Sequence, residues 1–266
     1  MVSSFVFNSQ MCYGGDDEIC YPESDGAPVA ESDPTRNYLF YGVETLKNHF
    51  QNREDVYVSG NLFIYYERGV PSAVIAPDVF VIFGVPNTER TVYKAWEENN
   101  HLPSFVMEIT SRTTKANDQR DKPSIYARLG VSEYFQYDPT CDYLNPPLQA
   151  SRLVNGVYEP IQPVSLEDGG ICIYSEVLGL DLRLLRGDLR FYHPGTDTFY
   201  PTYGEIAQRL RLAENARLEA ENARLETETA LKAAVARLQI LGLNLEQIAT
   251  TLGLSVEKVQ SYLTIA

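Results

Sequence analysis

Three residues in the middle of the chain have side chains that could together hydrolyse a phosphodiester. Asp78 precedes the apolar run Val-Phe-Val-Ile-Phe, Glu108 interrupts the run Phe-Val-Met-Glu-Ile, and Lys122 precedes Ile-Tyr-Ala-Arg-Leu. The reaction requires neutralised phosphate charge, a nucleophilic water and a stabilised leaving oxygen. A hard divalent cation on carboxylate oxygens supplies most of this, and a lysine can polarise the water or bind the phosphate. We therefore predict a site for Mg²⁺ (or Mn²⁺).

This prediction depends on geometry that the sequence only suggests. Two carboxylates must lie within about 5 Å to share one ion, because metal–oxygen distances are about 2.1 Å. Neighbouring strands lie about 4.8 Å apart, so Asp78 and Glu108 meet this condition if their strands pair. Structural alternatives remain open: Pro-Asp is a common turn dipeptide, and a lone Lys122 is typical of a surface. Glu108, inside an apolar strand, must be paired, metal-bound or on a solvated face.

The surrounding pattern predicts the elements that position these residues. Val74–Phe83 reads as one strand with a break at Pro77, which lacks an N–H and suits a strand edge. Phe105–Ile109 reads as a buried strand, followed by a helix that stops at Gly130 and by a strand over Tyr134–Tyr137. The order strand, strand, helix, strand predicts a mixed β-sheet flanked by helices, and hence the α/β class.

The N-terminal part divides into an irregular arm and a helix. Residues 1–30 are rich in Gly, Asp, Ser and Pro. Ser32-Asp33-Pro34 then supplies a cap and a proline for the first turn. Apolar residues follow at spacings of four, three and four, which predicts a helix ending near Gln51: Leu39, Val43, Leu46 and Phe50. After the central region, we expect strands over 158–164, 171–174 and 189–192, with a turn at Gly187-Asp188.

A seven-residue repeat marks the C-terminal part. Glu-Asn-Ala-Arg-Leu-Glu-Ala at 214–220 recurs as Glu-Asn-Ala-Arg-Leu-Glu-Thr at 221–227, which aligns Leu218 with Leu225. The repeat predicts a long helix over 204–241 and a short coiled coil that ends where Lys232 breaks the register. Residues 242–266 predict two short helices joined at Gly253. A helix-turn-helix for DNA and a protein-packing hairpin both fit them.

Composition limits the kind of partner. The net charge is −14, and residues 1–33 alone contribute seven acids and no base. Such a chain has no broad affinity for nucleic acid, so binding to DNA would need a locally basic groove or a metal. No stretch approaches the roughly 18 apolar residues of a membrane helix, so no membrane partner is expected. The four cysteines form no metal-binding pair, and we interpret them as reduced thiols in a cytoplasmic protein.

The motifs also resemble a known family. They are Tyr21 to Glu31, Ala76-Pro-Asp-Val, Phe105-Val-Met-Glu-Ile-Thr-Ser, and Lys122-x-x-x-Tyr-x-x-x-Gly-Val-x-Glu-Tyr-Phe-x-Tyr-Asp-Pro. This set, spread over residues 20–200, is similar to the PD-(D/E)XK nuclease superfamily and, within it, to the Uma-two family of restriction endonuclease-like proteins. The pattern Tyr-x-x-x-Gly-Val-x-Glu-Tyr is its most specific part.

The resemblance implies a restriction-endonuclease-like core over 31–203 and Mg²⁺-dependent hydrolysis of DNA. It implies that Asp78 and Glu108 are the metal ligands, Lys122 the catalytic lysine and Glu31 an auxiliary acid. Thr110 stands where the superfamily usually has its lysine, two residues after the glutamate, so the lysine would come from the following helix. Lys115 is the fallback for that role.

Two interpretations of other classes remain beside the nuclease. One is a catalytically silent scaffold with a nuclease-like fold, which the acidic balance favours. The other is a coiled-coil interaction protein in which the C-terminal helices carry the function. Whichever interpretation holds, the repeat in the 204–241 helix predicts that the chain self-associates, most simply as a dimer.

Overall fold

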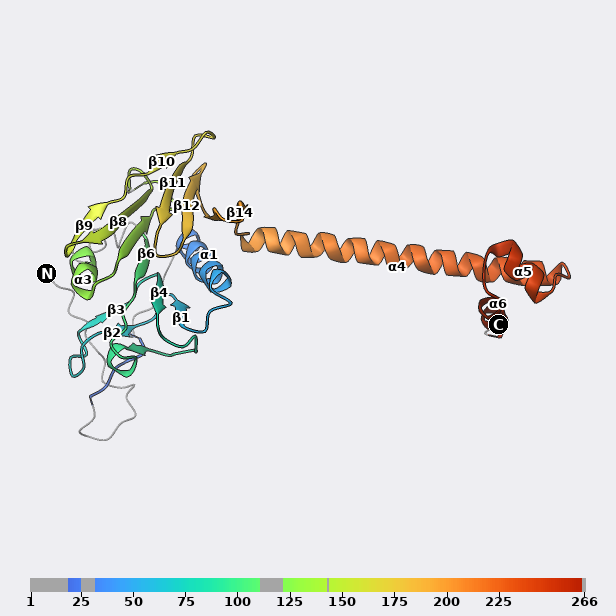
Figure 1. The fold of residues 1–266 in the computed structure, drawn as a ribbon, viewed down its shortest axis with the longest axis horizontal. Helices are drawn as coiled ribbons and strands as arrows, with labels where there is room; N and C mark the ends of the chain where they lie inside the picture. The colour runs from blue at the N-terminus through green and yellow to red at the C-terminus, as the bar shows by residue number, and fades with distance from the viewer. Residues whose placement is uncertain (1–18, 25–31, 111–121, 143, 265–266) are drawn as a thin grey trace. The chain divides into compact units, whose positions relative to one another are not determined.

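The computed structural model describes residues 19–24, 32–110, 122–142 and 144–264 of the 266-residue chain (Figure 1). The chain divides into two compact units, residues 1–201 and 202–266. The first holds all the strands, and the second is helical. Among the described residues, no helix is both long enough and apolar enough to cross a membrane.

A six-stranded sheet forms the centre of the first unit. Its strand order is β1-β4-β6-β7-β8-β9. Only β6 and β7 are parallel neighbours, and α3 (Lys122–Leu129) lies between them in sequence. The mixed α/β sheet predicted from the order of elements is confirmed. Its strands are β1 (Val56–Ser59), β4 (Val79–Phe83), β6 (Phe105–Ile109), β7 (Glu133–Tyr137), β8 (Leu148–Val154) and β9 (Val157–Pro160).

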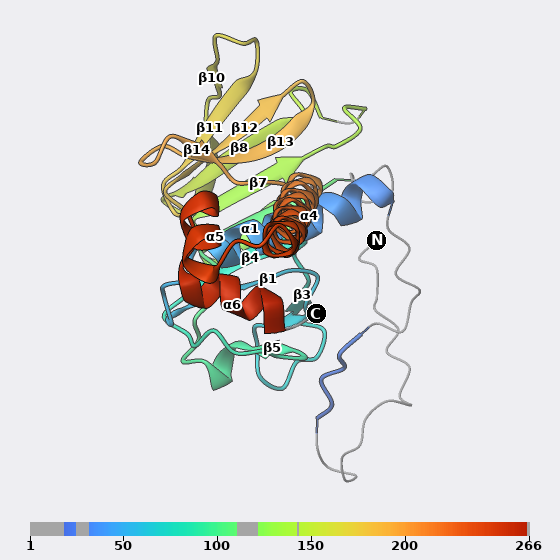
Figure 2. The ribbon, with the colours of Figure 1, turned by 90° about the vertical axis from the view of Figure 1, so that its right-hand side faces the viewer.

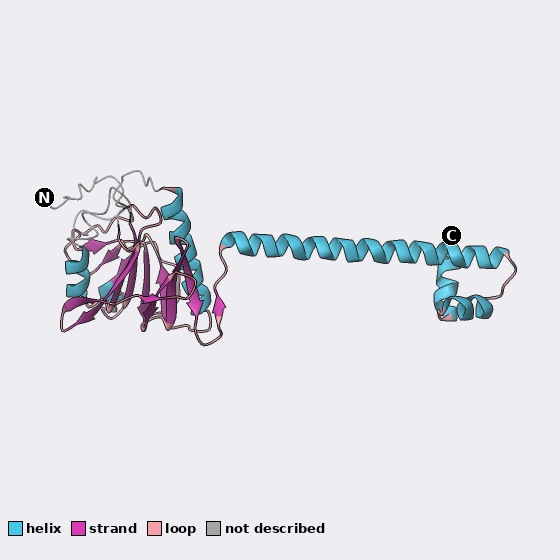
Figure 3. Cartoon of the chain, turned by 90° about the horizontal axis from the view of Figure 1, so that it is seen from above, coloured by secondary structure: helices cyan, strands magenta, loops and turns pink. Residues whose placement is uncertain are grey.

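Helices cover both faces of this sheet, so its strands lie between them in Figure 3. On one face lies α1 (Asp33–His49), which begins where the Ser32 side chain accepts a hydrogen bond from the Thr35 N–H. The apolar face of α1 packs against Met107 and its neighbours in one buried core. On the other face, Tyr126 of α3 packs with Val106 of β6. Alternate residues of β6 therefore enter two separate cores, as the period of a strand requires.

Two smaller sheets lie on opposite sides of the central one (Figures 1 and 2). The five-stranded sheet is antiparallel and shares the core of α1. Its strands are β10 (Val164–Ser165), β11 (Ile171–Ser175), β12 (Leu180–Leu185), β13 (Asp188–His193) and β14 (Thr198–Phe199). The three-stranded sheet shares the core of α3. It contains β2 (Ile64–Tyr65), β3 (Val74–Ile75) and β5 (Tyr93–Lys94), and β5 runs into the short helix η1 (Ala95–Glu97).

Three sequence-based expectations need correction. The run 74–83 is not one strand, because β3 and β4 belong to different sheets and the break at Pro77 separates them. In the stretch after residue 142, the strands β8 and β12 were not expected, and the expected strand over 158–164 is divided between β9 and β10, which belong to different sheets. Cys20 is disulfide-bonded, whereas Cys141 and Cys172 are free thiols, so the expectation of four reduced thiols is wrong for Cys20. Spacing along the chain does not report whether two Cβ atoms approach within about 4 Å, which is what a disulfide requires.

The second unit is one long helix with a helical hairpin on its C-terminal end. α4 (Tyr203–Ile240) starts at a reciprocal capping box between Thr202 and Glu205. α5 (Leu245–Leu252) and α6 (Val256–Thr264) are joined through Gly253, whose φ of 65° suits glycine. The hairpin packs on the last turns of α4 around Val235. The predicted long helix and hairpin are confirmed.

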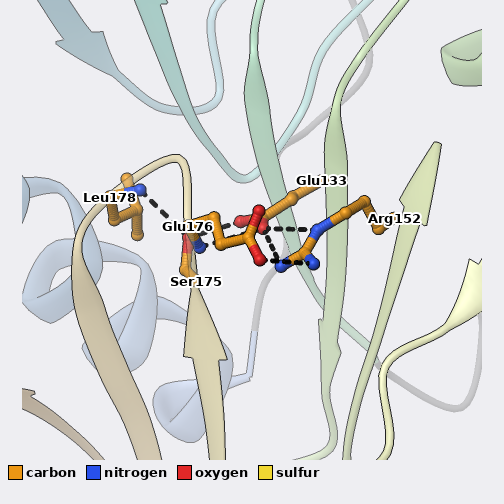
Figure 4. Close-up of polar contacts among 5 residues, drawn as sticks. All are labelled: Glu133, Arg152, Ser175, Glu176 and Leu178. Carbon is orange, nitrogen blue, oxygen red and sulfur yellow. Dashed lines mark hydrogen bonds and ion pairs between the residues drawn. The ribbon is translucent and has the colours of Figure 1, made fainter. Parts of the chain in front are cut away.

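A buried glutamate ties the two larger sheets together. Glu133, at the start of β7, has a side chain only 1% exposed. Its Oε1 accepts hydrogen bonds from the Arg152 Nη2 at 2.9 Å and the Glu176 N–H at 3.0 Å, and its Oε2 accepts one from the Ser175 Oγ (Figure 4). Arg152 belongs to β8, whereas Ser175 ends β11 of the other sheet. The carboxylate is thus solvated by protein donors instead of water.

We expect Glu133→Gln to destabilise the protein by about 2–4 kcal/mol. The amide cannot accept all of these bonds, and it removes the buried one of the two carboxylates that pair with Arg152, leaving only the exposed Glu176. Urea unfolding followed by circular dichroism would measure the loss. The control is Glu167→Gln at an exposed turn position, which should change stability by less than about 0.5 kcal/mol. Equal stability of the two variants would contradict the structural role of Glu133.

Candidate functional site

The candidate site is built on Glu108, a carboxylate buried inside strand β6. Its side chain is 1% exposed. Its Oε2 accepts a hydrogen bond from the Lys122 Nζ at 2.8 Å, and its Oε1 accepts one from the Tyr126 hydroxyl at 2.5 Å. Both donors come from α3 and are four residues apart, so they project from the same face of that helix. The carboxylate is therefore paired, which is the condition for burying it.

Asp78 lies beside Glu108, directly before the neighbouring strand β4. β4 and β6 are antiparallel, with Val79 opposite Met107, and one further step of this register places Asp78 opposite Glu108. The Asp78 Oδ2 accepts a hydrogen bond from the Ile109 N–H at 2.7 Å. Phe80, two residues after Asp78 and so on the same face, belongs to the core that contains Tyr126. The two acidic side chains thus face the same side of the sheet.

Burial and charge act together on Tyr126. Burial raises the pKa of its hydroxyl well above the ordinary value, and the nearby carboxylates of Glu108 and Asp78 raise that pKa further. The Asp78 carboxylate is thus close enough to raise the pKa of the Tyr126 hydroxyl. Because the phenol stays protonated at any working pH, it remains a hydrogen-bond donor to Glu108.

Local sequence explains why α3 presents these groups. Pro123 is its second residue, a position in the first turn where a missing N–H breaks no helical bond. The helix ends before Gly130, whose φ is 79°, and the Val131 N–H bonds back to the Tyr126 carbonyl. The Tyr158 hydroxyl of β9 donates to the Val131 carbonyl at 2.8 Å. The end of α3 is therefore held against the sheet edge.

Gln136 of β7 completes a polar row across three strands. The parallel register places it directly beside Glu108. It is the only residue of β7 that is not buried. Asp78 is also half-buried, so solvent reaches the row on both sides of Glu108. Sequence reasoning missed Gln136 and assigned no role to Tyr126. The available signals were a polar residue inside an apolar strand and a tyrosine one helical turn after Lys122.

The other residues of the sequence motifs are either outside the described part of the chain or have structural contacts. Glu31 and the fallback Lys115 lie outside the described residues. Thr110, at the position where the superfamily pattern has its lysine, is buried and bonds through its N–H and its hydroxyl to the Tyr137 carbonyl. Asp138, which follows β7, accepts hydrogen bonds from Thr140 and the Leu144 N–H. These bonds make Asp138 a turn-forming residue.

The donors at this site fit a hard divalent cation. Within the part of the chain that the structure describes, no group of three or more His, Cys, Asp or Glu side chains is arranged to hold a metal. The candidate ligands are two carboxylates, Asp78 and Glu108. Mg²⁺ is commonly held by one or two carboxylates, with water and substrate phosphate completing its octahedron. The ligand types at this site are therefore compatible with Mg²⁺ or Mn²⁺.

Comparison with known proteins points to nucleases. Residues 25–185 match the family model Uma2, which is described as "Putative restriction endonuclease". No curated protein sequence matches the chain. Among solved structures, a "putative nuclease belonging to DUF820" from Anabaena variabilis ATCC 29413 is similar at 12% identity and a TM-score of 0.36. That similarity covers 52% of this chain and 74% of the other.

We expect Lys122→Met to lower the free energy of unfolding by about 1–3 kcal/mol. The substitution keeps the length of the side chain but leaves the Glu108 carboxylate buried without its counter-charge. The estimate is at the low end for such pairs because the Lys122 side chain is 28% exposed. Chemical denaturation at neutral pH would measure it.

The matched control is Lys47→Met on α1. Lys47 pairs with Glu44 at 3.3 Å, but both side chains are largely exposed. Its substitution should cost less than about 0.5 kcal/mol. If both lysine variants were equally stable, the Lys122–Glu108 pair would contribute nothing to the fold.

Proposed function

The chain belongs to the Uma2 family, described as "Putative restriction endonuclease", and we propose that it is a divalent-metal-dependent endonuclease acting on DNA phosphodiester bonds. One observation carries the proposal. A buried carboxylate, Glu108, faces a second one, Asp78, across two paired strands, with the Lys122 ammonium 2.8 Å from its Oε2. Acid, acid and ammonium are the groups that metal-assisted phosphodiester hydrolysis requires.

Each residue has a distinct part in the proposed reaction. Asp78 and Glu108 would hold Mg²⁺ or Mn²⁺, which when bound neutralises phosphate charge and makes a coordinated water more acidic. The Ile109 N–H and the Tyr126 hydroxyl hold the two carboxylates in place. Lys122 would bind the scissile phosphate or orient the attacking water. Glu31 remains proposed as an auxiliary acid on the strength of the family resemblance.

The acidic balance of the chain limits how DNA can bind. At a net charge of −14, long-range attraction for a polyanion is absent, so binding must rely on the metal and on local cations. We therefore expect DNA affinity to depend strongly on the divalent ion. A bound cation would supply local positive charge for the DNA backbone even though the chain as a whole is acidic.

We predict that Asp78→Asn and Glu108→Gln each reduce cleavage of plasmid DNA by at least about a hundredfold in Mg²⁺ or Mn²⁺. Each change replaces a charged ligand with a neutral amide of the same shape. A gel assay of nicked and linear product measures the loss. Glu167→Gln, an exposed change of the same type, should cleave normally. Undiminished cleavage in both site variants would refute the assignment.

The same variants separate an enzyme from a silent scaffold. Calorimetric titration of the unmodified protein with Mn²⁺ should show a site that disappears in Asp78→Asn. If no such site exists and no cleavage is seen, the fold serves as a scaffold, as the acidic balance would also allow. If binding is present without cleavage, the metal site stands and the substrate proposed here is wrong.

We further propose that α4 mediates self-association into a dimer. Its residues 208–227 are all exposed within this unit, including Leu218 at 46% and Leu225 at 51%. The hairpin of α5 and α6 covers only the C-terminal turns, around Val235. A second copy of the helix would bury the two aligned leucines in a short seam. In this view residues 31–203 form the catalytic domain, 204–241 the dimer helix and 242–266 a hairpin.

We predict that Leu218→Lys combined with Leu225→Lys converts a dimer into a monomer in sedimentation analysis. The two ammonium groups cannot be buried in an apolar seam. Ala216→Lys combined with Ala223→Lys adds the same charge on another face of α4 and should leave the dimer intact. A dimer that survives the leucine changes, or a monomeric unmodified protein, would show that α4 does not pair along these leucines.

A further inference from the structure

The two oxygens of the Glu108 carboxylate have different partners, and the difference suggests different tasks. Oε1 is bound by Tyr126, which is fully buried, whereas Oε2 is bound by Lys122, whose side chain is 28% exposed. The Oε1 side therefore faces the protein interior and the Oε2 side faces the solvent-accessible end of the site. A cation that enters from solvent meets the oxygen that Lys122 occupies.

We infer that Tyr126 is a positioning residue that permanently holds the Glu108 Oε1, while Lys122 is a resident counter-cation that must leave Oε2 when a divalent ion binds. The inference rests on the proposed function, because it concerns the same site. It adds two things to that function: a role for Tyr126, and a competition between Lys122 and the metal.

The interior side of the site is built to keep Tyr126 in place. Its ring packs in the apolar core with Val106 and Tyr134, and the ring centroids of the two tyrosines are 5.3 Å apart. Its carbonyl accepts the Val131 N–H that closes the helix. A side chain fixed at both its backbone and its ring has no alternative position for its hydroxyl. The carboxylate of Glu108 consequently cannot rotate without losing this bond.

On the solvent-accessible side of the site, the partner of the Glu108 Oε2 is a flexible side chain. Lys122 is the first residue of α3. Its ammonium sits on a long side chain with several rotatable bonds, and it can exchange one acceptor for another at little cost. Neutralising Glu108 in the absence of metal and approaching a phosphate in its presence are therefore compatible tasks for one lysine. The first task explains how a carboxylate 1% exposed is tolerated before any metal binds.

This division predicts changes of opposite sign in metal affinity. Tyr126→Phe removes the bond that orients the ligand, and loss of such a partner weakens metal binding by about tenfold or more. Lys122→Met removes the competing ammonium, so Mn²⁺ should bind about fivefold tighter or better. The same lysine variant should lose cleavage. A simple loss of structure around the site would weaken binding in both variants.

The experiment is calorimetric titration of the full-length protein with Mn²⁺, together with the melting temperature of each metal-free variant. Tyr158→Phe is the matched control for Tyr126. It deletes a hydroxyl that donates to the Val131 carbonyl at 2.8 Å, just beyond α3, whereas the side-chain donors to Glu108 in the described structure are Lys122 and Tyr126. Lys47→Met is the control for Lys122. We expect both controls to bind Mn²⁺ as the unmodified protein does.

The outcomes separate this inference from the proposed function. If the unmodified protein binds Mn²⁺ and Lys122→Met binds it equally or less tightly, the competition does not exist although the metal site stands. If Tyr126→Phe and Tyr158→Phe bind alike, Tyr126 does not position the ligand. If Tyr126→Phe does not fold, the sign of the change in Lys122→Met still decides the competition. If the unmodified protein binds no Mn²⁺, the proposed metal site itself fails.

Discussion

The cost of burying the negative charge of Glu108 determines the arrangement of this site. A carboxylate removed from water is unstable unless donors or cations replace its hydration. Here α3 supplies both a phenol and an ammonium from one helical face, at positions 122 and 126. The position of α3 over the sheet is thereby coupled to the negative charge of one strand residue, Glu108. The packing of Tyr126 and the ion pair of Lys122 both serve to stabilise the buried carboxylate of Glu108.

A second buried glutamate in the same sheet shows what a closed arrangement looks like. Glu133 accepts bonds from a guanidinium of the neighbouring strand β8 and from a hydroxyl and a backbone N–H at the end of β11. The donors of β11 join the second sheet to the first. Glu108 instead is bound by two side chains of one helix, and the register places a second carboxylate, Asp78, opposite it. In the proposed function, two glutamates of similar burial thus differ in role because Glu108 has this second carboxylate beside it.

The sheet topology is what brings the acidic residues together. β4 runs antiparallel to β6, so the residue just before β4 lies beside the fourth residue of β6. β6 and β7 are parallel, which requires a crossover, and α3 belongs to that crossover. The crossover places the start of α3 near the carboxyl end of β6. The topology therefore assembles Asp78, Glu108 and Lys122 from separate parts of the chain.

The sequence by itself determined the periodic elements and the identity of the charged candidates. The buried strand around Glu108, the helix stop at Gly130, the seven-residue repeat of α4 and the hairpin at Gly253 follow from local patterns, since each depends on neighbours in the chain. The strands β8 and β12 were missed although the dipeptides Asn155-Gly156 and Arg186-Gly187 adopt the positive φ of their turns. Those strands carry mixed polar and apolar residues whose burial depends on the second sheet.

Only the tertiary structure decided which side each acid faces, that the 74–83 run divides between two sheets, and that Tyr126 bonds to Glu108. Register across strands and the packing of a helix on a sheet are long-range properties, and a pattern along the chain does not encode them. The type of each residue limited the chemistry to carboxylates and an ammonium. The fold decided which of these groups lie side by side.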